Sequence, residues 1–141
     1  MIEQNHTVTV LGVSWVDGQE DRIEQTYPCN FSQVGGKFFL LYEEPTDSGK
    51  TVRTLIKAEP GKFSLRRGEN PASAMHFDQK KVTTCAYPTA VGTLPLEIYT
   101  DDIRFALTAR GGKIVASYSL SQQGQLIRRN RIELRVSPRK K

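Results

Sequence analysis

Short segments rich in glycine, proline and aspartate recur at regular intervals along this chain, and they constrain its fold more than any other feature. The clearest of them are Asp17-Gly18, Gly35-Gly36, Pro60-Gly61, Asp101-Asp102, Gly111-Gly112 and residues 122–124. Spacing of roughly ten residues between such signals is typical of an all-β meander. A βαβ unit would need a crossover of roughly a dozen residues or more, and the intervals leave no room for one.

Apolar and polar residues alternate with a period of two between these turn signals. In the last segment Ile132, Leu134 and Val136 share one face, and the charged residues between them share the other. Because successive side chains of a strand point to opposite faces, the pattern indicates one buried and one solvated face. No stretch carries the i, i+3, i+4, i+7 pattern well enough to demand a helix.

The pattern predicts about ten strands on one continuous thread, and a sheet of that size tends to curl or close because open edges invite aggregation. We therefore predict an all-β fold, an up-and-down antiparallel meander barrel of about eight to ten strands, with a two-sheet sandwich as the alternative. Residues 1–136 are expected to form this single domain. The basic segment 137–141 is expected to leave the last strand as a frayed tail.

Several short motifs occur in a characteristic order. They are Leu65-Arg66-Arg67-Gly68, then Met75-x-Phe77, then Tyr87-Pro88-Thr89-Ala90-Val91-Gly92-Thr93-Leu94, and finally Gly112-x-Ile114 followed by Tyr118. In these elements the chain resembles the YwiB-like family over nearly its whole length. These are small bacterial proteins of unknown function with a calycin-like, lipocalin-type β-barrel. The resemblance implies the fold and no established reaction.

The composition favours a cytoplasmic protein. The longest apolar run, residues 38–42, is too short for a membrane-spanning helix, and the polar N-terminus lacks the apolar stretch of a secretory signal. The two cysteines, Cys29 and Cys85, are far apart in sequence and suggest no disulfide framework.

The net charge of +5 is concentrated at the C-terminus. Residues 128–141 hold seven basic side chains and one acidic, and the preceding 127 residues hold thirteen basic and fourteen acidic. On the solvated face of the last predicted strand, Arg129, Arg131 and Arg135 form a basic stripe. Such a stripe could contact phosphates, so a nucleic-acid-associated or protein-interaction module is our alternative function.

Three polar residues fall on otherwise apolar faces and suggest a ligand site inside the barrel. They are Arg67, Tyr118 and Arg128. An inward guanidinium requires a carboxylate partner or an anionic ligand. The leading prediction is therefore a module that binds a small apolar or anionic amphiphile. The competing interpretation is that both arginines lie at strand ends and extend into water.

No set of residues converges into catalytic or metal-binding chemistry. The only cysteine–histidine pair worth considering is His76 with Cys85, which we expect to share the solvent face without an activating neighbour. We therefore predict no enzyme activity, no metal site and no cofactor. Whether the protein is a monomer or a homodimer is left open.

Overall fold

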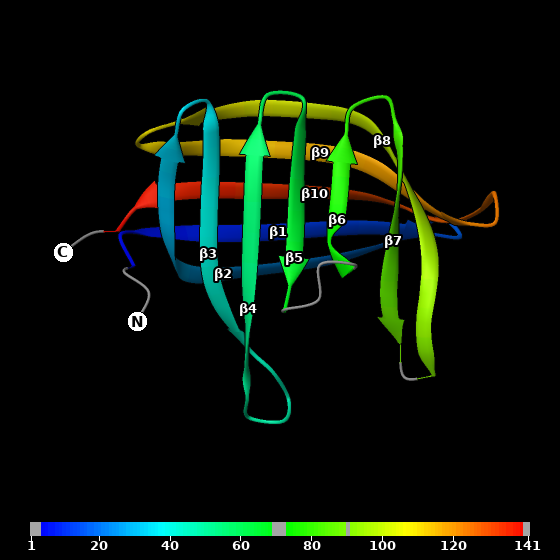
Figure 1. Ribbon diagram of the computed structural model, residues 1–141. Helices are drawn as coiled ribbons and strands as arrows, with labels where there is room; N and C mark the ends of the chain where they lie inside the picture. Colours follow the sequence, from blue (N-terminus) through cyan, green and yellow to red (C-terminus); the bar gives the residue numbers. More distant parts are fainter. Residues whose placement is uncertain (1–3, 69–72, 90, 140–141) are drawn as a thin grey trace.

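The computed structural model describes residues 4–68, 73–89 and 91–139, and it consists of ten β-strands (Figure 1). The first five strands are β1 (His6–Val16), β2 (Gln19–Val34), β3 (Lys37–Pro45), β4 (Thr51–Glu59) and β5 (Lys62–Arg67). The remaining five are β6 (Met75–Asp78), β7 (Val82–Thr89), β8 (Gly92–Thr108), β9 (Gly111–Gln122) and β10 (Gln125–Pro138). Within the described residues, no helix is long and apolar enough to cross a membrane.

All ten strands join one antiparallel sheet in the order β6-β5-β4-β3-β2-β1-β10-β9-β8-β7. The first and last strands, β1 and β10, pair over ten positions from His6–Pro138 to Trp15–Arg129. The two strands at the ends of this order, β6 and β7, lie next to each other: the hydroxyl of Thr83 in β7 donates to the carbonyl of His76 in β6. The chain is therefore a nearly closed meander barrel, which confirms the predicted fold class.

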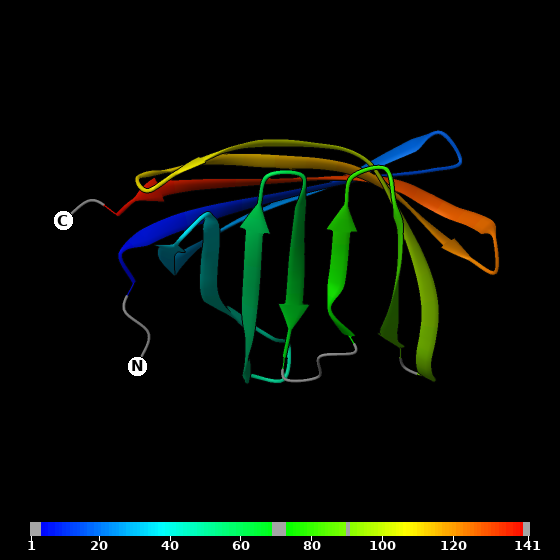
Figure 2. The same ribbon diagram turned by 45° about the horizontal axis from the view of Figure 1, so that its top comes forward.

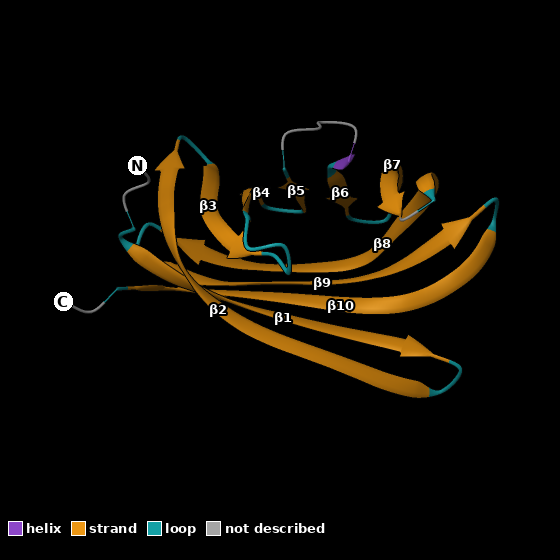
Figure 3. Ribbon diagram, turned by 90° about the horizontal axis from the view of Figure 1, so that it is seen from below, coloured by secondary structure: helices purple, strands orange, loops and turns teal. Residues whose placement is uncertain are grey.

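Two long strands divide the barrel into two layers that cross each other, as Figures 1 and 2 show. β2 pairs with β1 through residues 19–29 and then with β3 through residues 30–34. β8 pairs with β7 through residues 92–99 and with β9 through residues 97–108. Viewed from below in Figure 3, β4 to β7 are seen nearly end-on, above the layer formed by β8, β9, β10, β1 and β2.

Stacked aromatic rings fill the space between the layers. The rings of Phe63 and Phe77 are stacked with their centroids 4.5 Å apart. Phe77 also packs edge-to-face against Tyr118, with 4.7 Å between the ring centroids. Phe38 contacts Phe105 of the opposite layer at 5.7 Å. Aromatic pairs in such offset or edge geometries add to the stability gained from burial alone.

Two of the hairpins have the turn chemistry that the sequence predicts. Asp17 and Gly18 link β1 to β2 with positive φ angles of 51° and 77°. Gln123 and Gly124 link β9 to β10 with nearly the same angles. A two-residue loop with positive φ at both positions is the type I′ turn, whose twist matches that of the flanking strands.

Two other pairs that the sequence predicts as turns lie within strands, so those predictions are wrong. Gly111 and Gly112 begin β9, where the backbone of its neighbours passes so close that an added Cβ would lie 2.3 Å from the Val136 oxygen and 2.0 Å from the Ala106 oxygen. Asp101 and Asp102 lie inside β8, at a register shift that marks a β-bulge. The glycine pair is therefore needed where neighbouring backbone passes close to β9, and the aspartate pair lies at a bulge of β8. The sequence does not distinguish either case from a turn.

The C-terminal strand is two residues longer than predicted. Ser137 and Pro138 pair with Thr7 and His6, and the amide of Arg139 donates to the Asn5 carbonyl at 3.1 Å. The expected fraying of residues 137–139 is therefore wrong, because β1 supplies partners for this backbone. Lys140 and Lys141 lie outside the described residues, as does Ala90 of the family motif.

Candidate functional site at the open end of the barrel

We use "open end" for the end of the barrel at which β3, β5 and β7 finish, the lower end in Figure 1. Inward-facing residues here are more polar than those of the aromatic core. Arg67, Tyr118 and Arg128 all have the inward parity of their strands. Tyr118 is mostly buried, whereas Arg67 and Arg128 are exposed, as the competing interpretation expects. The structure nevertheless divides them between two groups of side chains.

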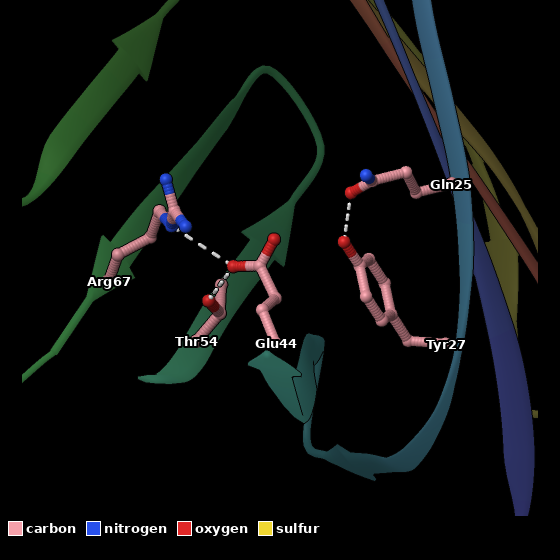
Figure 4. A network of polar contacts seen from close by, with 5 residues as sticks. All are labelled: Gln25, Tyr27, Glu44, Thr54 and Arg67. Atoms are coloured by element: carbon pink, nitrogen blue, oxygen red, sulfur yellow. Dashed lines mark hydrogen bonds and ion pairs between the residues drawn. The ribbon is translucent and has the colours of Figure 1, made fainter. Parts of the chain in front are cut away.

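Arg67, at the end of β5, belongs to a group held together by Glu44 of β3 (Figure 4). Its Nε donates to Glu44 Oε2 at 3.0 Å, and the hydroxyl of Thr54 donates to the same oxygen at 2.6 Å. Thr54 is completely buried and pairs in register with both Tyr42 and Arg67, so neighbouring strands place this group. The carboxylate partner that an inward Arg67 requires is therefore supplied by the chain itself.

Two tyrosines extend this group toward β2. The rings of Tyr27 and Tyr42 stack at 5.1 Å, and the Tyr27 hydroxyl donates to Gln25 Oε1. Burial raises the pKa of Tyr42, and the negative charge of Glu44 raises it further while Arg67 lowers it. The pKa of Tyr27 is raised by the same causes, burial first. At neutral pH both phenols are protonated, and Glu44 and Arg67 cancel each other's charge.

Tyr118 and Arg128 form the second group, which joins β9, β10 and β7. Burial raises the pKa of Tyr118 to about 12, Tyr87 raises it too, and the positive charge of Arg128 lowers it. Arg128 donates to the Ser14 hydroxyl at 3.4 Å. Of the carboxylates in the described residues, none lies within 4.0 Å of its guanidinium. Arg128 therefore differs from Arg67 in having its charge uncompensated.

Apolar side chains around the second group point inward and yet remain accessible. Ile23 pairs with Gly12 and is 60% exposed, while Tyr87 and Leu94 are 45% and 37% exposed. An added Cβ on Gly12 would meet nothing within 4 Å, so the inner face of β1 is uncovered at this point. Inward apolar surface that no other part of the described chain covers is surface that a ligand could bury.

Among the members of these groups that sequence reasoning missed are Glu44 and Tyr87. Glu44 has the same parity as Tyr42, so alternation alone could have placed it inside the barrel. Tyr87 belongs to the family motif of residues 87–94, and its nearness to Tyr118 depends on the pairing of β7 with β8, which the sequence does not specify.

The cysteine–histidine pair does not exist. Cys85 is buried in the core, and burial raises its pKa, so the thiol is kept protonated. His76 alternates to the opposite, outer face and is exposed. The expectation of a shared solvent face is therefore wrong. The sequence alone could not show this, because it does not give the relative alignment of β6 and β7. Within the described residues, no three histidine, cysteine or acidic side chains gather as a metal site would require.

The basic stripe lies on the outer face of β10, between β1 and β9 rather than at a sheet edge. Arg135 is 3.7 Å from Glu133, which also contacts Lys113 at 3.6 Å. Arg131 is half-buried, and Arg129 lies across from Trp15 of β1. Cross-strand pairing thus places one aromatic residue beside the arginines of the stripe.

The strand order, the crossing layers and the inward polar groups define a calycin-like antiparallel β-barrel. The chain belongs to the family described as Domain of unknown function (DUF1934), whose model matches residues 8–134. Its fold is similar to that of the ywiB protein from Bacillus subtilis, with a TM-score of 0.82 and 22% identity over 99% of this chain and 96% of that one. The YwiB-like resemblance is thereby confirmed. Among curated proteins, none matches the chain.

Proposed function

We propose that this protein is a non-catalytic binding module that holds a small anionic amphiphile at the open end of its barrel. Arg128 faces the head group, the Tyr118 hydroxyl donates to it, and the apolar tail covers Ile23 and Leu94. The observation that supports this proposal is that Arg128, which has the inward parity of β10, remains accessible and has no carboxylate partner among the described residues. Arg67 contributes less to binding of the head group than the sequence suggested, because its guanidinium is already paired with Glu44.

A cytoplasmic location is part of the proposal. Cys29 and Cys85 are both free thiols, and reducing compartments keep thiols in that form.

Calorimetric titration of dodecanoate and dodecanol tests this function. We expect dodecanoate to bind wild-type protein, and Arg128→Met to weaken it by about tenfold, since a charge-assisted hydrogen bond contributes on the order of 1.5 kcal/mol. Dodecanol, which lacks the charge, should bind both proteins equally. Arg67→Met is the matched control and should change the affinity for dodecanoate much less. No binding of either probe, or equal losses in the two variants, would contradict the proposal.

A second candidate function is contact with a nucleic acid through the outer face of β10. It is favoured by the position of Trp15 across from Arg129, because an aromatic ring beside a guanidinium can stack on a base. It is weakened by Glu133, which compensates Arg135. Binding of a single-stranded oligonucleotide that falls steeply with added salt, and is lost when Arg129 and Arg131 become Gln, would support it.

A further inference from the structure

The outer face of β4, β5 and β6 contains two adjoining hollows, which we call the outer recess. The larger has a volume of about 410 Å³ and the smaller of about 200 Å³, and they share Lys57, Ser64 and His76. These three residues occupy one cross-strand row, because Lys57 pairs with Ser64 and Ser64 pairs with His76. Side chains directly opposite one another in such a row have Cβ atoms about 5 Å apart, so the three polar groups lie close together.

Arg66 lies one row further along the same face. It pairs with Leu55 and lines the smaller hollow. Two residues along a strand span about 7 Å, so its guanidinium reaches the space between Lys57 and His76. Among the described residues, this small hollow is therefore lined by an ammonium, a guanidinium, an imidazole and the Ser64 hydroxyl, and by no acidic side chain.

Three cations of the outer recess have no carboxylate partner in the described part of the chain. Neither Lys57 nor Arg66 has a carboxylate within 4.0 Å, and the same holds for Lys37 at the rim of the larger hollow. The two acidic residues of the larger hollow already contact other lysines. Glu59 lies 3.3 Å from Lys62, and Asp78 lies 3.9 Å from Lys81.

An independent observation concerns Arg66 itself. Its Nε is buried and has no hydrogen-bond partner. A buried donor without an acceptor costs stability, and such groups in native proteins call for an explanation such as an absent ion or ligand. An oxyanion in the smaller hollow would satisfy Nε and place its negative charge beside Lys57.

We propose that the outer recess binds the phosphate group of a small phosphate monoester. The phosphate lies in the smaller hollow, where Arg66, Lys57 and Ser64 donate to its oxygens and His76 closes the far side. The organic part of the ester extends into the larger hollow, whose volume is in the range of small-molecule sites. This inference is independent of the proposed function, because Arg66 and His76 have the outward parity of their strands and Arg128 has the inward parity of β10.

Titrations of phenyl phosphate and inorganic phosphate, followed by calorimetry at physiological salt, test the inference. We expect phenyl phosphate to bind wild-type protein, and Arg66→Met to weaken it by about tenfold or more, as loss of a charge-assisted contact would. The matched control is Arg53→Met, which removes a cation from the same face that is already paired with Glu43 at 3.7 Å. This control should leave the affinity for phenyl phosphate nearly unchanged.

The two probes also identify the source of the phosphate. Tighter binding of phenyl phosphate than of inorganic phosphate supports an ester, and equal binding assigns the site to free phosphate and overturns the ester. Failure of both probes to bind, or equal losses in Arg66→Met and Arg53→Met, overturns the site itself. Dodecanoate binding is unaffected by either variant if the barrel interior is a separate site.

Discussion

Arg66 and Arg67 are consecutive residues of β5, yet they face electrostatically opposite regions of the molecule. Arg67 points to the open end, where Glu44 lies 3.0 Å from it and also accepts the Thr54 hydroxyl. Arg66 points to the outer recess, where its Nε is buried without an acceptor. Arg67 therefore has a counter-ion within the barrel, whereas Arg66 has none among the described residues.

The same division separates the acidic neighbours Glu43 and Glu44 on β3. Glu44 is inward-facing, and its side chain is only 14% exposed, whereas Glu43 faces outward and is 43% exposed beside Arg53. The two arginines are about equally accessible, with Arg67 58% and Arg53 54% exposed, so both ion pairs are screened by water. What distinguishes Glu44 is that it also accepts the hydroxyl of the fully buried Thr54. On both β3 and β5, therefore, two consecutive charged residues lie on opposite faces of the strand, and only the inward-facing one joins the group around Thr54.

The largest effect at neutral pH is expected from Glu44→Leu. This change leaves the fully buried Thr54 hydroxyl without its acceptor and removes the counter-ion of Arg67, which is 58% exposed and adds little, so we expect the free energy of unfolding to fall by about 1–2 kcal/mol. Urea denaturation measures the loss. Glu43→Leu is the control, and as an exposed pair it should cost about 0.5 kcal/mol or less. Equal losses in the two variants would show that the inward group has no special structural role.

A further effect is expected at alkaline pH from Tyr118. Its folded pKa is raised from 10.0 to about 12 by burial, so the protonated phenol stabilises the fold fully below pH 10. This stability is lost as the pH rises through 12, because the unfolded chain then gives up the proton more readily. The loss is on the order of 2 kcal/mol.

Tyr118→Phe should remove this part of the pH dependence between pH 10 and 12, measured by urea denaturation at each pH. The remaining slope belongs to other buried groups such as Cys29, whose pKa burial raises to about 12. Tyr99→Phe, at the outer face, controls for the loss of a hydroxyl. An unchanged alkaline slope in Tyr118→Phe would mean that the open end admits water to this phenol.

The fold could be predicted because its two signals are local. Alternation in β10 and the Asp17-Gly18 hairpin are written in neighbouring residues, and both are as expected. What the sequence could not supply is the environment of a glycine or aspartate pair. Gly111-Gly112 has the composition of a turn, but only the backbone of Val136 and Ala106 shows that these residues are needed for a close approach.

The candidate site could be predicted in part. Parity placed Arg67, Tyr118 and Arg128 on inward positions, because the side-chain period of a strand is two. It could not show that Glu44, 23 positions earlier than Arg67, would pair with it, since that contact depends on how β3, β4 and β5 are aligned. The outer recess was missed for the same reason: Lys57, Ser64 and His76 become neighbours only through strand register.

The smallest effect is expected from Arg66→Met, and its sign tests the comparison between the two arginines. Methionine keeps the half-buried aliphatic stem and removes a guanidinium that has no acceptor, so we expect unfolding free energy to stay constant or to rise by about 0.5 kcal/mol. Arg67→Met, one residue along, should instead lower it by about 1 kcal/mol, because Glu44 loses its counter-ion. Urea denaturation of the two variants without added phosphate measures both. A loss in Arg66→Met as large as in Arg67→Met would make Arg66 a structural residue and remove the reason for assigning it to a ligand. A gain would show that the chain keeps this arginine at a cost to its own stability, as binding residues commonly are kept.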